Sequence, residues 1–374
     1  MLSYLYNNLF LCSVIYLTIA TNKYFFNFNN IIFLFSLFIH LAFTIIYIKL
    51  FPYSDWETYF FWADSLEPKN LKFHNFFSSH LIVALIVYLK HFLFLNKINI
   101  ILLFSLFSFF GILIFVKNLI KLGVEKKITY FFLFIPTFHF WTSMPGKDSL
   151  IILLLSIFFY FYLEKKFFIS ILFILLVSLL RPHVGVIFFL SYLLSEIFFA
   201  GTKKKITLFL NLLIFLFLIL YFPRTAGFFL TEKDIFIDNI FYQALNQLHI
   251  IMNKYQMTNS AYENTNILSN MFNYFIFPTD LIFKKTSLLT SFSIFIDAFT
   301  FVLVAILIFR NRKLEINNKK LIIFLSLISI IYCLVFPQIF FNYGLNSRQK
   351  WMILPFVIYL SFSLRNLFVK INKI

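Results

Sequence analysis

The chain has 374 residues, of which 61% are hydrophobic and 13% are charged. Globular domains are about 45–50% apolar and about 25% charged, so this composition excludes an ordinary soluble fold and fits a lipid bilayer. The formal net charge is +17, but lysine and arginine occur in short clusters between apolar runs. Such clusters indicate membrane topology, and nucleic acid is not expected as a partner.

Apolar runs of helix-spanning length recur from one end of the chain to the other. We therefore expect an all-α, polytopic membrane protein with about eleven transmembrane helices in a single membrane domain, residues 1–374. The first run lacks a basic flank and a small-residue cleavage site, so it is predicted to be a retained span. The predicted spans are 5–20, 31–50, 98–119, 129–144, 148–163, 167–180, 184–200, 207–222, 286–309, 321–337 and 353–364.

The basic clusters predict which loops face the cytoplasm. From residue 121 onward they fall on alternate loops, and the basic C-terminal tail is predicted to be cytoplasmic. The opposite loops are then extracytoplasmic, including a large loop at 223–285 that contains five acidic residues. The basic clusters are Lys121/Lys126/Lys127, Lys165/Lys166, Lys203–Lys205, Arg310/Arg312/Lys313/Lys319/Lys320 and Arg365/Lys370/Lys373.

Residues 80–95 leave the first third of the topology open. This stretch is apolar but is interrupted by Lys90 and His91. As a short span it would place 51–79 in the cytoplasm. As an interfacial helix lying on the outer leaflet, it would make 51–97 a long first extracytoplasmic loop. Periodicity alone does not decide between the two.

Polar side chains gather at the predicted outer ends of the helices. A carboxylate at such a place can act as a general base, and cations can hold a phosphate. We therefore predict a catalytic pocket at the membrane surface. Separately, the two cysteines, Cys12 and Cys333, are expected to form no disulfide framework and no metal motif. The candidate residues are Asp55, Glu57, Lys147, Asp148, Arg181, His183, Arg224, Arg348, Gln349 and Lys350.

Each candidate also has a simpler role. Asp55 and Glu57 could solvate a loop. Asp148 could cap the helix that starts at Ser149, in which case Asp148→Asn should leave folding little affected. Arg181 could be a snorkelling flank residue, although an arginine on the outer face then needs an anionic partner. We also expect His139 and Trp141 at the interfacial belt, and Asp297, within a span, facing the protein interior.

The layout resembles the GT-C superfamily of membrane glycosyltransferases, which take sugars from polyprenyl-linked donors. Asp55 in "SDWETYFFWAD" matches the acidic residue of that family's first outer loop. Residues 76–95 match its interfacial helix, which favours the extracytoplasmic placement of 51–97. Lys121–Lys127 match its basic turn, and Asp148 in "WTSMPGKD" matches its second acidic motif.

Three short motifs are also similar to O-antigen and capsule repeat-unit polymerases of the Wzy type: "P-x-x-x-F-W-x-S-x-x-x-K-D", "RPH" and "NxGxxxRQKWMxLP". This resemblance implies transfer of a sugar or repeat unit from a polyprenyl-(pyro)phosphate donor, at the extracytoplasmic face of a bacterial inner membrane. Polyprenyl-linked sugars or oligosaccharides, the lipid bilayer and other polysaccharide-assembly proteins are the implied partners. Asp55 would be the base with Asp148 assisting or orienting, and Arg181, Arg348 and Lys350 would hold the phosphate.

The chain departs from the GT-C pattern in two respects. No soluble C-terminal domain, such as many GT-C enzymes have, is expected. The sequence has no D-x-D motif, so no metal and no other cofactor is predicted. Alternative functions are a GT-C enzyme adding one sugar, a lipid-linked oligosaccharide flippase or other transporter, and a scaffold of the same assembly. Transporters typically contain internal repeats and helices broken near the bilayer midplane, neither of which is evident in the sequence.

Overall fold

The computed structural model describes residues 2–50, 55–71, 78–199, 319–339 and 350–362, together with seven positions between 295 and 306. Every element in these ranges is a helix and none is a strand, which confirms the all-helical prediction. Four helices in the described part are long and apolar enough to cross a membrane: Tyr6–Phe26, Asn30–Lys49, Lys97–Lys121 and Pro182–Phe199. The predicted span at 207–222 lies outside the described residues.

The chain divides into two compact units, Met1–Gly185 and Val186–Ile374. In unit 2, α15 (Lys319–Ile339) and a helix at Lys350–Phe362 follow the boundary helix α10 (Pro182–Phe199). Unit 1 contains α1 (Leu2–Thr21), η1 (Asn22–Phe26), α2 (Asn30–Leu50), α3 (Asp55–Asp64), η2 (Pro68–Asn70), α4 (Ser78–Phe92), α5 (Lys97–Lys121), α6 (Lys126–Phe132), α7 (Pro136–Thr142), α8 (Lys147–Leu163) and α9 (Phe167–Leu180).

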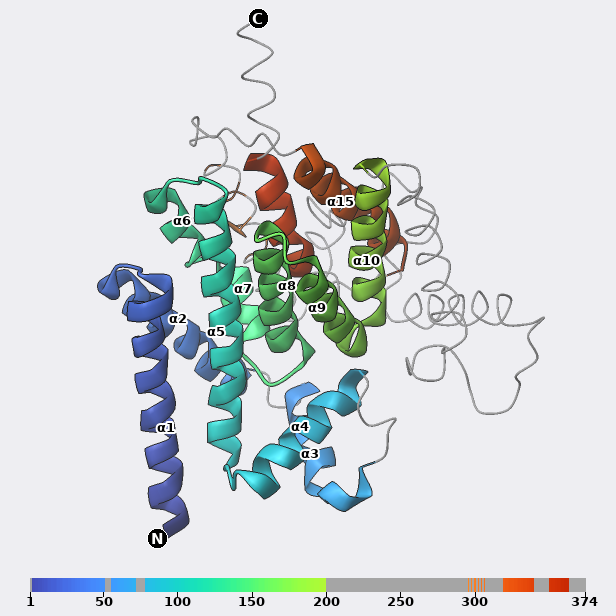
Figure 1. Cartoon of the computed structure of the whole chain (residues 1–374). Coiled ribbons are helices and arrows are strands. Elements are labelled where there is room, and N and C mark those ends of the chain that lie inside the picture. The colour runs from blue at the N-terminus through green and yellow to red at the C-terminus, as the bar shows by residue number, and fades with distance from the viewer. Residues whose placement is uncertain are drawn as a thin grey trace, which may run out of the picture. The chain divides into compact units, whose positions relative to one another are not determined.

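Helices α5 and α8 form the centre of unit 1 (Figure 1). They pack closely because Gly111 of α5 has no side chain. A Cβ atom at this position would lie 2.7 Å from the backbone nitrogen of Leu153 in α8. Small residues permit such backbone-to-backbone contact between helices in a bilayer, where the close packing replaces the hydrophobic effect as the source of attraction.

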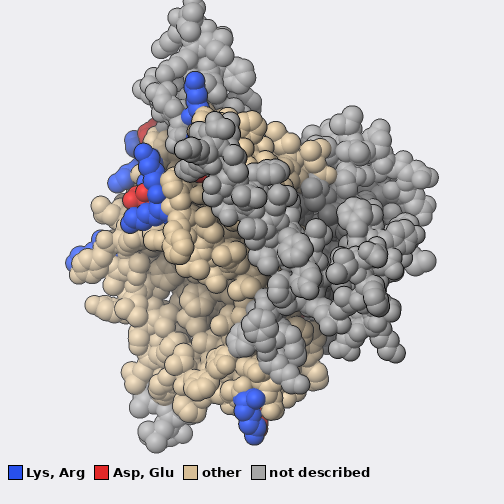
Figure 2. All heavy atoms as spheres, turned by 45° about the vertical axis from the view of Figure 1, so that its right-hand side comes forward, with Lys and Arg blue, Asp and Glu red and all other residues tan. Residues whose placement is uncertain are grey.

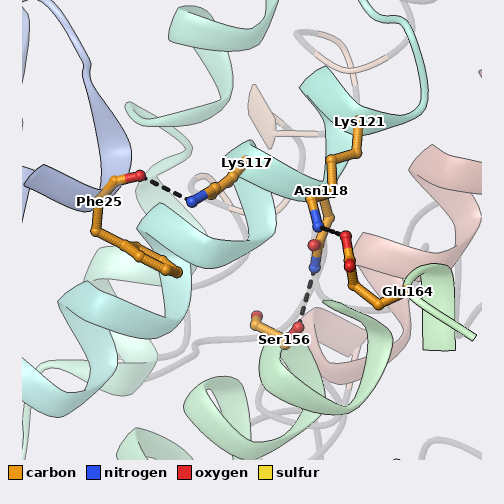
Figure 3. A network of polar contacts seen from close by, with 6 residues as sticks. All are labelled: Phe25, Lys117, Asn118, Lys121, Ser156 and Glu164. Atoms are coloured by element: carbon orange, nitrogen blue, oxygen red, sulfur yellow. Dashed lines mark hydrogen bonds and ion pairs between the residues drawn. The ribbon is translucent and has the colours of Figure 1, made fainter. Parts of the chain in front are cut away.

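Polar side chains at the C-terminal end of α5 form hydrogen bonds and an ion pair with η1 and α8 (Figure 3). The Lys117 ammonium donates to the carbonyl oxygen of Phe25 at 2.8 Å and lies 3.3 Å from the centre of that phenyl ring. The Asn118 amide donates to the Ser156 carbonyl oxygen of α8 at 2.9 Å. Lys121 forms an ion pair with Glu164 at the end of α8. The predicted basic turn therefore begins at a helix end that these contacts join to η1 and α8.

The expected single span over 129–144 is instead two short helices, α6 and α7. Pro136 causes the break, because it lacks an N–H group and its ring disfavours helical backbone in the preceding residue. Ile135 accordingly has extended dihedral angles, φ −64° and ψ 112°. Neither helix is long enough to cross a bilayer, so this prediction was wrong in its length and in its continuity.

The outer faces of α1 and α2 carry large apolar side chains that the protein does not cover. Leu9, Leu17, Ile31 and Phe38 are each more than half exposed. Much of the described surface in Figure 2 is likewise uncharged, with lysine and arginine confined to a few groups. Exposed apolar area of this extent is what a lipid-facing surface requires, and it agrees with a membrane protein.

Candidate functional site

Two chain connections meet at one end of unit 1. The first joins α7 to α8 through Pro145 and Gly146, so that Lys147 and Asp148 are the first residues of α8. The second joins α9 to α10 at Arg181. Pro182 begins α10, and the residue before a proline favours extended backbone, as Arg181 shows with φ −141° and ψ 90°. Both connections therefore place charged residues at helix ends.

Asp148 and Arg181 form a buried ion pair. Nη2 of Arg181 donates to Oδ1 of Asp148 at 2.6 Å, and the two side chains are only 8% and 3% exposed. A charge-assisted hydrogen bond of this kind is stronger than a neutral one, and it fixes the orientation of the guanidinium. Asp148 also lies in the first turn of α8, where the helix dipole favours a negative charge.

Lys147 and His183 lie beside this pair. Lys147 directly precedes Asp148 at the start of α8, and His183 lies two residues after Arg181 in α10. Burial and the positive charges of Arg181 and Lys147 favour the neutral form of the His183 ring. We call Lys147, Asp148, Arg181 and His183 the Asp148 cluster. Its two cations and one carboxylate give a net charge of +1 when His183 is neutral. A positive cluster at a helix N-terminus is suited to bind an anion.

Helix α3 reaches the same connection. A Cβ atom on Gly146 would lie 3.8 Å from Cε2 of Tyr59, so the buried Tyr59 ring packs directly against the residue before α8. Asp55 is the first residue of α3 and lies one turn before Tyr59, on the same face of the helix. The Asp55 side chain is exposed and Glu57 is half-buried. The structure thus brings the helix of the predicted base to the Asp148 cluster.

Helix α4 lies across this end of unit 1 and packs on α3, α8 and α9 (Figure 1). Its buried face contains Ile82, Val83 and Ile86. Lys90, which interrupted the apolar run in the sequence, forms an ion pair with Asp64 of α3. A helix that lies across the ends of α8 and α9 is expected to make these contacts. Helix α4 is also too short to be among the four candidate spans.

The remaining site predictions concern unit 2. Lys350 begins the helix Lys350–Phe362, and its Nζ atom lies 4.0 Å from Oδ2 of Asp297. Both side chains are mostly buried, so Asp297 faces the interior as predicted. Arg224, Arg348 and Gln349 lie outside the described residues. Lys350 therefore has a carboxylate neighbour within its own unit.

Two polar contacts of the described part were not predicted. Glu196 of α10 forms an ion pair with Lys320 of α15. His139, which we expected at the interfacial belt, is fully buried and lies 2.8 Å from His40 of α2. The sequence carries one sign of this: Ser36, His40 and Thr44 follow each other at a spacing of four in an otherwise apolar run, which places them on one face of α2.

Within the described ranges, no three His, Cys, Asp or Glu side chains come together as metal ligands would. No protein-family model, no curated protein and no solved structure matches the chain. Functional inference therefore depends on the residues and geometry given above.

Proposed function

We propose that the protein is a glycosyltransferase of bacterial surface-polysaccharide assembly that uses a polyprenyl-(pyro)phosphate-linked sugar donor. A repeat-unit polymerase acting at the extracytoplasmic face of the inner membrane is the form we favour. The observation that carries the proposal is the buried Asp148–Arg181 pair at the start of α8, with Lys147 and His183 beside it.

The Asp148 cluster is suited to the phosphate of such a donor. Asp148 holds the Arg181 guanidinium in one orientation, and arginine binds phosphate oxygens through paired hydrogen bonds. Lys147 and the N-terminus of α8 add positive potential at the same place. The cluster lies at the ends of apolar helices, so a bound phosphate would sit at the membrane surface while its polyprenyl tail stays in the bilayer.

The chemistry needs a base as well as an anion site. In the proposed step Asp55 takes the proton of the acceptor hydroxyl, whose oxygen forms a bond to the anomeric carbon of the donor sugar. The bond from that carbon to the phosphate oxygen breaks, and Arg181 and Lys147 stabilise the charge on the departing phosphate. In this account Asp148 is a positioning residue for Arg181. Arg348 and Lys350 belong to unit 2, and their role in phosphate binding remains a prediction from the sequence.

A lipid-linked oligosaccharide flippase is the second candidate. The break between α6 and α7, with a buried polar contact at His139, is a feature of transporter helices. The position of the Asp148 cluster at helix ends, rather than at the middle of a span, favours the transferase. A flippase moves its substrate without breaking the sugar–phosphate bond, so bond cleavage separates the two.

The proposal is tested by complementing a strain that lacks the gene with Asp55→Asn, and by measuring the length of surface polysaccharide on a gel together with membrane abundance. We expect short glycans at wild-type protein level. Asp64→Asn is the matched control, since Asp64 is on the same helix but its exposed side chain pairs with Lys90. Exposed ion pairs contribute about 0–1 kcal/mol, so this control should support full-length polymer. Full-length polymer from Asp55→Asn would refute the assignment of the base.

A further inference from the structure

The interior of unit 1 holds two histidines whose rings meet. His40 lies near the middle of α2 and His139 lies in α7, and both are fully buried. Their Nδ1 atoms are 2.8 Å apart, a hydrogen-bond distance that requires one proton between them. Ionisable side chains inside a membrane span are rare and costly, so such a pair calls for a functional explanation.

The other ring nitrogen of His139 determines its protonation. Nε2 lies 2.7 Å from the carbonyl oxygen of Leu133. A carbonyl oxygen only accepts, so this nitrogen carries a proton, and Nδ1 of a neutral His139 is an acceptor. Pro136 makes the contact possible, because in a continuous helix the N–H of Thr137 would occupy the Leu133 carbonyl. The helix break therefore supplies the partner that sets the His139 tautomer.

His40 has two neighbours at its own Nε2 atom. The Ser105 carbonyl oxygen lies at 2.9 Å and the Ser108 hydroxyl at 2.8 Å. If Nε2 donates to the carbonyl, both Nδ1 atoms are bare in the neutral rings, and their contact requires an additional proton. If the Ser108 hydroxyl donates to Nε2, His40 keeps its proton on Nδ1 and donates it to His139. The same contacts thus fit a charged pair and a neutral pair.

The Ser108 hydroxyl can serve both states. Its oxygen is 2.8 Å from the Ser105 carbonyl oxygen as well as 2.8 Å from Nε2 of His40. In the charged state the hydroxyl donates to the carbonyl beside the Nε2–H group, and in the neutral state it turns to donate to Nε2. A single hydroxyl rotation therefore accompanies the gain or loss of a proton, with no helix required to move.

We propose that His40 and His139 form a proton-binding site in the interior of unit 1. The site alternates between a neutral pair and a pair that carries one additional proton, and in both states one proton lies between the two Nδ1 atoms. Uptake adds a proton from water to Nε2 of His40 and returns the Ser108 hydroxyl to the Ser105 carbonyl. The proton already on Nδ1 of His40 then becomes the shared one. Release reverses these steps, and no other bond is made or broken. This site does not depend on sugar transfer.

The surroundings keep the bound proton exchangeable. Aromatic rings flank the pair, with Phe43 of α2 stacked on His139 and Phe109 of α5 against His40. Among the described residues, the only titratable group that acts on His40 is His139, and burial and a backbone carbonyl are what act on His139. A buried carboxylate would hold a positive charge permanently. Here only hydrogen bonds stabilise the positive charge of the His40–His139 pair, so the additional proton can be released.

The proposal is tested by NMR titration of the ring nitrogens in ¹⁵N-histidine-labelled protein in lipid nanodiscs, with His40→Gln and His139→Gln used for assignment. We expect the two rings to take up one proton in a single shared step as the pH falls from about 8 to about 3, because burial without a neighbouring carboxylate favours the neutral pair. Rings that keep an Nδ1–H form of His40 and an Nε2–H form of His139 throughout this range would overturn the proposal.

Two serine variants test the role of the hydroxyl. In the neutral state Ser108→Ala leaves Nε2 of His40 without its hydrogen-bond donor, whereas in the charged state the Nε2–H group still has the Ser105 carbonyl oxygen as its acceptor. The midpoint should therefore rise by about one pH unit, a tenfold gain in proton affinity. Ser36→Ala is the matched control, because Ser36 of α2 is buried like Ser108 of α5 but its hydroxyl donates to the Phe33 carbonyl oxygen. The control should titrate like the wild type. A Ser108→Ala midpoint equal to that of the control would overturn the proposed switch.

Discussion

Removing either charge of the Asp148–Arg181 pair should destabilise the protein strongly. The two side chains are 3% and 8% exposed, so water cannot solvate the charge that is left behind. Breaking a buried ion pair by removing one partner typically costs about 3–5 kcal/mol. Asp148→Asn and Arg181→Gln should each lower the free energy of unfolding by this amount. The expectation from helix capping alone, that Asp148→Asn leaves folding little affected, therefore no longer holds.

Neutralising both residues should cost less than the sum of the single changes. The double variant loses the charge-assisted hydrogen bond, about 1.5–3 kcal/mol, but leaves no uncompensated charge. Two single losses of about 3–5 kcal/mol and a double loss of about 3 kcal/mol give a coupling energy of about 3 kcal/mol or more. The assay is equilibrium unfolding of the purified protein in mixed micelles. The reasoning would be refuted if each single variant lost less than about 1 kcal/mol of unfolding free energy and the double variant lost the sum of the two, because that is the result expected of a solvent-exposed ion pair.

Two further predictions concern the frame of unit 1. Gly111→Ala should lower the free energy of unfolding by about 1–3 kcal/mol, because the new methyl group meets the α8 backbone at 2.7 Å. Gly146→Ala is the control and should leave the free energy of unfolding nearly unchanged, since its new methyl group would lie at an ordinary 3.8 Å from Tyr59. An equal loss of unfolding free energy in the two variants would contradict the packing argument. The hydrogen bond and charge of Lys121 hold the pKa of Glu164 below its ordinary value. This stabilisation is present above the unfolded-state pKa and is lost as pH falls through the folded-state value. Lys121→Gln should therefore raise the pKa of Glu164, and its stability deficit at neutral pH should vanish in acid; an unchanged pKa in a ¹³C NMR titration would contradict the assignment.

Within the described ranges, most helices were predictable from the sequence. The predicted run 167–180 coincides with α9, and 148–163 differs from α8 by one residue. Apolar runs bounded by charged residues define such helices because the bilayer admits few other structures. The prediction failed at 129–144, where apolar periodicity continues through Pro136 but the backbone hydrogen bonds cannot. Hydropathy is insensitive to that interruption.

The sequence predicted which charged residues lie at the same end of the helices, but not which of their side chains are in contact. Alternation of the loops placed Asp148 and Arg181 at the same end, because α8 and α9 are joined by a short turn. That these two residues pair with each other depends on how the two helices are rotated, which the sequence does not specify. The His40–His139 contact joins residues 99 positions apart, and it depends on the helix break at Pro136, which the predicted single span over 129–144 did not include. Long-range contacts of this kind come only from the fold.

The most direct test of the proposed function is cleavage of the sugar–phosphate bond by the purified protein in lipid nanodiscs. A polyprenyl-diphosphate-linked repeat unit is supplied, and the released polyprenyl diphosphate and the lengthened glycan are quantified by mass spectrometry. The account predicts both products in equal amounts from the wild type. It predicts neither from Asp55→Asn, nor from the Asp148→Asn/Arg181→Gln variant held at a temperature where it remains folded. Intact lipid-linked donor after incubation with folded wild-type protein, together with its movement between leaflets, would contradict the transferase and support a flippase.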